Sequence, residues 1–139
     1  MADWIETMTG RSRGYALSIS TPLFQLATEA IRVHSNATGR FQSLAQLVIE
    51  RVSCAPILED HDPEIMRDHL RLIPTKGDVQ IYLSIPREDA DKLVATKKEL
   101  SARIGQRLTV PDAVSLILLD SIADDRTTEV LRKMAIPMS

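Results

Sequence analysis

The stretch Val79-Gln80-Ile81-Tyr82-Leu83-Ser84-Ile85 decides the fold, because apolar and polar side chains alternate along it. Alternation with a period of two is typical of a β-strand that has one buried and one exposed face. Pro86 follows directly and opens a predicted helix, since proline is favoured in the first helical turn. Gly105 breaks that helix, and a predicted capping box of Thr109 and Asp112 begins a second one. The stretch therefore starts a strand-helix-helix unit.

The same order of elements is predicted earlier in the chain. Residues 15–20 alternate like the later strand, and Thr21-Pro22 is a helix-start signal, with threonine as the N-cap and proline at the first helical position. A second helix begins near Ser43, which is spaced to form a capping box with Gln46. The helix predicted after Asp112 is apolar almost all round, so we expect it to be the most buried element.

Short sequence matches support a duplication of this unit. Leu17-Ser18-Ile19 corresponds to Leu83-Ser84-Ile85 at an offset of 66, and Arg40-Phe41 is matched with Arg107-Leu108 at an offset of 67. The matching order of the elements is stronger evidence than these few identities. The predicted division is a first unit at residues 14–54, a connector with a short helix at 55–77, a second unit at 78–122 and a C-terminal tail at 123–139.

The composition excludes several classes of protein. The 139 residues carry 17 Lys and Arg against 19 Asp and Glu, which gives a net charge of −2 and argues against a polybasic tail or an acidic disordered chain. The single cysteine, Cys54, excludes an internal disulfide. No stretch has the roughly 20 apolar residues of a membrane span, and the N-terminus lacks the pattern of a signal peptide. We therefore expect a cytoplasmic protein without membrane partners.

The sequence contains no motif that predicts catalysis. It has no phosphate-binding glycine loop and no nucleophile elbow, so we expect neither an enzyme nor a bound cofactor. His61 and His69 lie in an acidic connector, but their spacing is not that of a rigid helical metal-binding pair. We predict no metal site. We predict His34, at the end of an apolar helical stripe, to be a packed or half-exposed helix residue.

A single strand with two helices cannot bury its own edge, but two such units can pair their strands antiparallel and interlock their helices. Both halves of the chain resemble the ribbon-helix-helix superfamily of DNA-binding proteins in this respect. The resemblance is carried by the alternating strand, by Pro86 and by the Arg107-Leu108-Thr109 entry to the second helix. It implies an α+β, mostly α fold, in which residues 1–139 form one intramolecular pseudo-dimer around a two-stranded antiparallel ribbon. Tandem units in one chain resemble the accessory proteins of conjugative plasmids and T-DNA transfer.

In this family the ribbon enters the major groove of double-stranded DNA, and its outward side chains contact base edges. If Ile81, Leu83 and Ile85 point to the core, the alternation turns the intervening side chains outward. The implied base-contacting positions are Gln80, Tyr82 and Ser84 in the second unit and Ala16 and Ser18 in the first. The first-unit set, which also includes Gly14, has almost no hydrogen-bonding reach.

The resemblance also implies contacts to the DNA phosphates. The N-terminus of each second helix offers amide groups and the positive end of a helix dipole, here at Ser43 and Thr109. Two arginines that precede these helices and two in the N-terminal arm are the implied cationic contacts: Arg40, Arg107, Arg11 and Arg13.

Three functional interpretations follow. The first is an accessory factor that acts with a relaxase or another transfer protein at a transfer origin or border sequence. The second is a transcriptional repressor or antitoxin-type autoregulator. The third is a protein-interaction module that has lost DNA readout. The near-neutral charge favours it, and so does the lack of long polar side chains on the outward face of the first strand. The sequence leaves open the DNA target, readout by the first strand, and pairing of two pseudo-dimers on DNA.

Overall fold

The computed structural model describes residues 12–53 and 62–135, with side chains up to residue 126. These residues form one two-stranded antiparallel sheet and five helices, which makes the class α+β and mostly helical, as predicted. The elements in chain order are β1 (Ser12–Ile19), α2 (Thr21–Thr38), α3 (Leu44–Val52), α4 (Pro63–Leu72), β2 (Val79–Pro86), α5 (Arg87–Ile104) and α6 (Val110–Ala135). None of the helices in the described ranges has the length and apolarity required to span a bilayer.

The two strands form a ribbon whose faces differ in polarity. β1 pairs with β2 over their whole length, with Ala16 opposite Tyr82 at the centre. One face is apolar and packs on the helices: Leu17, Ile19, Leu83 and Ile85 are each at most 8% exposed, while Ile81 is partly buried. The alternation predicted from the sequence is therefore confirmed, because alternate apolar side chains of both strands pack into or against the core.

The first strand begins earlier than the sequence indicated. β1 starts at Ser12, so Arg13 and Gly14 lie within the strand and not in the arm before it. Backbone pairing with β2 supplied the partners that extended the strand, and the alternation over residues 15–20 alone did not show them.

The helices that follow the strands begin within one position of the predicted signals. Ser20 is the N-cap of α2, and its Oγ accepts a hydrogen bond from the Leu23 amide at 3.0 Å. Thr21, the predicted cap, is therefore the first helical residue. Pro86 was expected to open α5, but it ends β2 and is the N-cap residue of the helix, which starts at Arg87.

The two halves share local features at a constant offset of 66. Helices α2 and α5 each have 18 residues, and they end at Gly39 and Gly105 with φ of 71° and 80°. Glycine adopts this left-handed conformation without the penalty of a Cβ atom. The cap amides donate to the carbonyls of Ser35 and Ser101, 2.9 Å away in each half. The loops to the next helix therefore have the same length.

This offset overturns one match made from the sequence. It aligns Arg40 with Gln106 and Phe41 with Arg107, so the match of Arg40-Phe41 with Arg107-Leu108 at an offset of 67 is wrong. The second helices confirm the smaller offset, because α3 starts at Leu44 and α6 at Val110. The arginine common to both loops suggested that the offset increases from 66 to 67 between the strand and the second helix, and the equal loop lengths exclude this increase.

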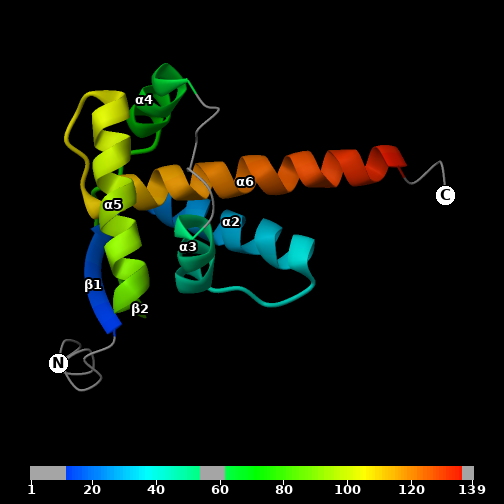
Figure 1. Ribbon diagram of the computed structural model, residues 1–139, viewed down its shortest axis with the longest axis horizontal. Helices are drawn as coiled ribbons and strands as arrows, with labels where there is room; N and C mark the ends of the chain where they lie inside the picture. The colour runs from blue at the N-terminus through cyan, green and yellow to red at the C-terminus, as the bar shows by residue number, and fades with distance from the viewer. Residues whose placement is uncertain (1–11, 54–61, 136–139) are drawn as a thin grey trace.

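The C-terminal region also differs from the prediction. A separate C-terminal tail was expected from residue 123, but α6 continues without a break from Val110 to Ala135. Its first part is the most buried stretch of the described chain, with residues 113–118 all at most 3% exposed, as the apolar sequence predicted. Figure 1 shows α6 running from the ribbon end of the molecule, alongside α2, to the opposite end. No helix-breaking residue stands near position 123.

Helix α4 is the short helix expected in the connector, and its N-cap is Asp62, whose side chain accepts a hydrogen bond from the Glu64 amide at 2.9 Å. Its buried side chains are Met66 and His69. His69 Nε2 lies 2.8 Å from Ser115 Oγ, which is fully buried in α6. Helix α4 is therefore attached to α6 by a buried polar contact as well as by apolar packing.

The apolar core is one cluster that draws on both halves of the chain. Leu47 of α3 is fully buried, and it lies in the same cluster as Leu93 of α5 and Leu116 of α6. Because the halves share one core, we expect them to unfold together.

The Leu47→Ala substitution tests this shared core. It should lower the free energy of unfolding by about 2–5 kcal/mol, the usual cost of a cavity at a buried leucine. Chemical denaturation should show one transition when helix content and the environment of Tyr82 are followed separately. Phe41→Ala is the control, since Phe41 is 99% exposed and its loss should change stability little. Separate transitions of the two halves would contradict a shared core.

Candidate nucleic-acid interface

The outward face of the ribbon brings together all five predicted base-contacting residues. In the register, Ser18 lies opposite Gln80, Ala16 opposite Tyr82, and Ser84 opposite Gly14. The five predicted residues are exposed, and the Tyr82 side chain is 43% exposed at the centre. Gln80 Nε2 donates a hydrogen bond to Ser18 Oγ at 2.8 Å, which orders two of these side chains across the strands. The face is polar and carries no charged residue.

The start of α3 is organised by Ser43, as the sequence predicted. Ser43 Oγ accepts from the Gln46 amide at 3.1 Å, and the Ser43 amide donates to Gln46 Oε1 at 2.8 Å. This capping box satisfies two amides of the helix start. The amides of Leu44 and Ala45 are the remaining first-turn donors without an intrahelical acceptor. The Ser43 hydroxyl is therefore a helix cap, and the neighbouring amides are the groups suited to an anion.

The start of α6 also has a capping box, but its capping side chain is a carboxylate where that of α3 is a neutral amide. The Thr109 amide donates to Asp112 Oδ2 at 3.0 Å, and the Asp112 amide donates to Thr109 Oγ1 at 3.3 Å. Asp112 Oδ1 also accepts from Thr75 Oγ1 at 2.8 Å. A carboxylate thus occupies the positive end of this helix, and Pro111 has no amide proton to offer. This helix start is less favourable for a phosphate than that of α3.

Of the four predicted cationic residues, the structure describes three. Arg107 and Arg40 are both exposed. Arg13 is also exposed, but it lies on the strand face of the buried Tyr15, and its guanidinium carbon is 5.1 Å from the centre of that ring. Because alternation turns Ala16 and Ser18 to the other side, Arg13 is not on the outward face of the ribbon. Arg11 lies outside the described residues.

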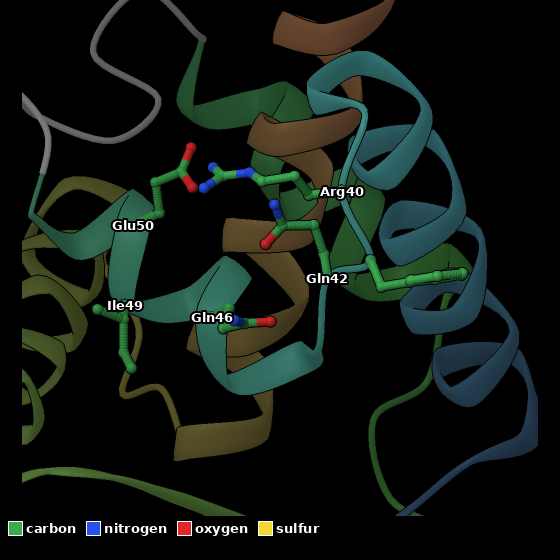
Figure 2. Close-up of a pocket in the computed structure, with 6 residues that line it drawn as sticks. Arg40, Gln42, Gln46, Ile49 and Glu50 are labelled. Atoms are coloured by element: carbon green, nitrogen blue, oxygen red, sulfur yellow. The ribbon is translucent and has the colours of Figure 1, made fainter.

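A shallow pocket of about 270 Å³ lies beside α3, and Arg40 forms part of it. The lining residues are Arg40, Phe41, Gln42, Gln46, Ile49 and Glu50. Figure 2 shows the side chains of Arg40 and Glu50 pointing toward one another along α3. Arg40 therefore extends along the helix and away from its N-terminal amides, which differs from the phosphate-contacting position expected from the sequence.

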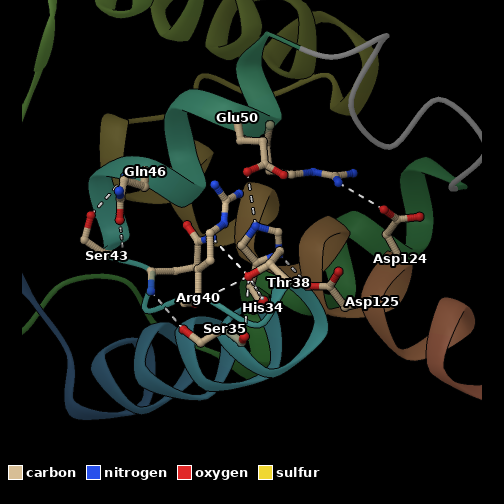
Figure 3. Close-up of polar contacts among 11 residues, drawn as sticks. His34, Ser35, Thr38, Arg40, Ser43, Gln46, Glu50, Asp124 and Asp125 are labelled. Atoms are coloured by element: carbon tan, nitrogen blue, oxygen red, sulfur yellow. Dashed lines mark hydrogen bonds and ion pairs between the residues drawn. The ribbon is translucent and has the colours of Figure 1, made fainter.

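A polar cluster beside this pocket fixes α3 against α2 and α6 (Figure 3). His34 of α2 is 4% exposed, and its Nδ1 and Nε2 atoms lie 3.0 Å from Asp125 Oδ2 and 3.3 Å from Glu50 Oε2. The sequence predicted a packed or half-exposed histidine, and the structure shows that it is packed. The two carboxylate partners come from other helices, so no local pattern in the sequence indicated them.

Arg51 makes the second connection between α3 and α6. Its guanidinium donates to the carboxylates of Asp120 and Asp124, the latter at 3.1 Å. Burial acts to lower the pKa of Arg51, but the two carboxylates more than offset this effect and raise it above its usual value. Arg51 therefore stays charged and serves as a structural link, which removes it from the residues available to DNA.

Among the residues that the structure describes, no three His, Cys, Asp or Glu side chains are arranged to hold a metal ion. His69 is committed to its contact with Ser115, and His61 and Cys54 lie outside the described ranges. Burial lowers the pKa of His69 below its ordinary value of 6.5, and the Ser115 contact only partly opposes this effect.

Comparison with known protein families, with characterised proteins and with solved structures finds no match for this chain. What the chain can bind must therefore be argued from its own geometry and chemistry.

The lowered pKa of His69 predicts a loss of stability in mild acid. The unfolded chain takes up a proton near pH 6.5, whereas the folded chain resists it, so the unfolded state gains stability as the pH falls below that value. Thermal unfolding between pH 8 and pH 5 should show this loss, and His69→Gln should have a flatter profile because glutamine does not titrate. All other residues are common to the two proteins, so the comparison isolates His69. Parallel profiles would contradict the prediction.

Proposed function

We propose that this protein binds double-stranded DNA by inserting the outward face of the β1–β2 ribbon in the major groove, as a ribbon-helix-helix pseudo-dimer within one chain. The observation that carries the proposal is the exposed face of Ser18, Ala16, Gln80, Tyr82 and Ser84 on a ribbon whose other face is anchored in the core. A two-stranded ribbon fits the major groove, which is about 12 Å wide. The buried face would hold the reading side chains in place.

The register supports a pseudo-two-fold axis through the ribbon. Ala16 and Tyr82 are cross-strand partners, and they are also separated by the same offset that relates the helix caps Gly39 and Gly105 of the two halves. A residue that pairs with its own counterpart marks the centre of a two-fold antiparallel ribbon. The two helix pairs that follow the strands would then lie in equivalent positions on either side of the DNA-binding face.

The absence of charge on the ribbon face favours recognition of bases over attraction to phosphates. Gln80 offers N–H donors and a carbonyl acceptor to a base edge, and a serine hydroxyl can donate or accept a hydrogen bond. Phosphate contacts would come from the first-turn amides of Leu44 and Ala45 and from Arg107. With a net charge of −2, binding to random sequence should be weak at physiological salt.

Two roles within DNA binding remain proposals. The fusion of two units in one chain favours an accessory factor at a transfer origin, acting beside a relaxase, over a repressor or antitoxin. The location of the gene, next to transfer genes or next to a toxin or its own operon, distinguishes them.

A protein-interaction module is the second candidate. The observation that favours it is the uncharged outward face of the ribbon, to which β1 contributes only Ala16 and Ser18 as exposed residues. Salt-dependent binding of duplex DNA at physiological ionic strength would exclude a module that has lost DNA binding.

The double substitution Gln80→Ala and Tyr82→Ala tests base readout. Binding to duplexes selected by the protein from random sequence should weaken at least about tenfold, because two base-contacting side chains are lost. Binding to unselected DNA should change little. Fluorescence anisotropy at fixed salt measures both. Lys98→Ala, on an exposed helix face, is the control. Unchanged affinity and preference in the double variant would contradict readout by the ribbon.

The Arg107→Ala substitution tests phosphate contact. Affinity should fall by about the same factor for selected and unselected duplexes, and the slope of log K against log salt should become shallower by about one unit. A titration between low and physiological salt measures this slope. A loss confined to the selected duplex would show that Arg107 contacts bases and not phosphates.

A further inference from the structure

We infer that the DNA site of this protein is asymmetric, with one half specified by the Gln80 end of the ribbon and the other half weakly specified. This inference rests on the proposed function. It concerns which DNA is bound and follows from the chemistry of the cross-strand pairs.

The two ends of the ribbon are equivalent in geometry and different in chemistry. Across the centre, Ser18 faces Gln80 at one end, and Gly14 faces Ser84 at the other. The offset between the halves makes Ser18 the counterpart of Ser84, and Gly14 the counterpart of Gln80. Each end therefore has one serine, but only one end has a side chain long enough to reach a base edge. A symmetric palindrome would present the same base to a glutamine at one end and to a glycine at the other.

The Gln80 end is also prepared for binding. The hydrogen bond from Gln80 Nε2 to Ser18 Oγ, 2.8 Å long, restricts the glutamine side chain before any DNA arrives. The amide retains a second N–H and its carbonyl oxygen, and this donor and acceptor match N7 and N6 of adenine. The entropy cost of ordering a long side chain is thereby reduced. Adenine is the base that we assign to this end.

The centre of the ribbon shows the same difference between the two strands. Tyr82 is 43% exposed and pairs with Ala16, so the aromatic ring belongs to β2 and has no aromatic counterpart on β1. All outward side chains larger than serine thus come from one strand. An antiparallel ribbon in which one strand carries the large base-contacting side chains contacts the two half-sites of the DNA unequally.

The helix starts repeat this asymmetry independently. The capping partner in α3 is the neutral Gln46, whereas in α6 it is the carboxylate of Asp112. A phosphate would meet two amide donors at α3 and a negative charge at α6. The two flanks of a bound duplex would therefore be held with different strength.

The experiment is a selection of duplexes from a random pool by the full chain and by three variants. The wild-type protein should enrich one conserved block that contains adenine, with little information at the inverted position. Gln80→Ala should remove that block, and Lys98→Ala, on an exposed helix face away from the ribbon, is the control in which the block should persist. Gly14→Gln should add the missing half, because it places a glutamine opposite Ser84 as Gln80 lies opposite Ser18. The Gly14→Gln protein should bind an inverted repeat of the block about tenfold more tightly than the wild type does.

The outcomes separate this inference from the proposed function. A palindromic preference of the wild-type protein, or a block that survives Gln80→Ala, would overturn the asymmetry while DNA binding stands. Enrichment of no sequence, with salt-dependent binding of all duplexes, would overturn it in the same way. If no duplex is bound at any salt concentration, the proposed function is overturned and the asymmetry with it. Thermal unfolding of each variant confirms that the exposed substitutions leave the fold intact.

Discussion

The antiparallel pairing of β1 with β2 is the constraint on which the rest of the structure depends. The strands are the only two in the described chain, so the backbone groups along their shared edge are satisfied by this pairing. Their pairing brings Leu17 and Ile19 of the first half beside Leu83 and Ile85 of the second, and all four side chains enter one core. The helices of either half would have no complete core without that pairing. The pairing therefore joins the earlier and later parts of the chain in one apolar core.

Local patterns were enough to predict the elements that local interactions determine. The period-two alternation placed Leu83 and Ile85 in the core, and the spacing of Ser43 and Gln46 predicted a capping box that the structure contains. Both features involve residues within a few positions of each other. The outward exposure of Gln80 followed from the same alternation, so the outward face of the ribbon could be derived from the sequence except for the register between its two strands.

Features that depend on distant residues could not be predicted in the same way. The start of β1 at Ser12 depends on its partner in the register, Pro86, which lies in the other half of the chain. The environment of His34 depends on Glu50 and Asp125, which lie in two other helices. The offset of 67 failed for a related reason, because the chance identity of Arg40 with Arg107 carried no information about loop length. In the structure, the glycine caps give the correct offset of 66, because their geometry sets where each second helix can begin.

The distribution of cations explains why a chain with 17 Lys and Arg would depend on few of them for binding DNA. Four described arginines are in ion pairs within the chain: Arg32, Arg51, Arg71 and Arg126. A cation beside a carboxylate acts at a distance as a dipole, so its attraction for phosphates decreases faster than that of a single charge. Under the proposed function, low affinity for random DNA follows from this arrangement. Discrimination must then come from the ribbon, where one hydrogen-bonded pair, Gln80 with Ser18, carries most of the chemistry that can distinguish bases. Weak attraction to phosphates raises the ratio of specific to non-specific binding, which is the quantity that decides whether a protein finds one site among many competing sequences.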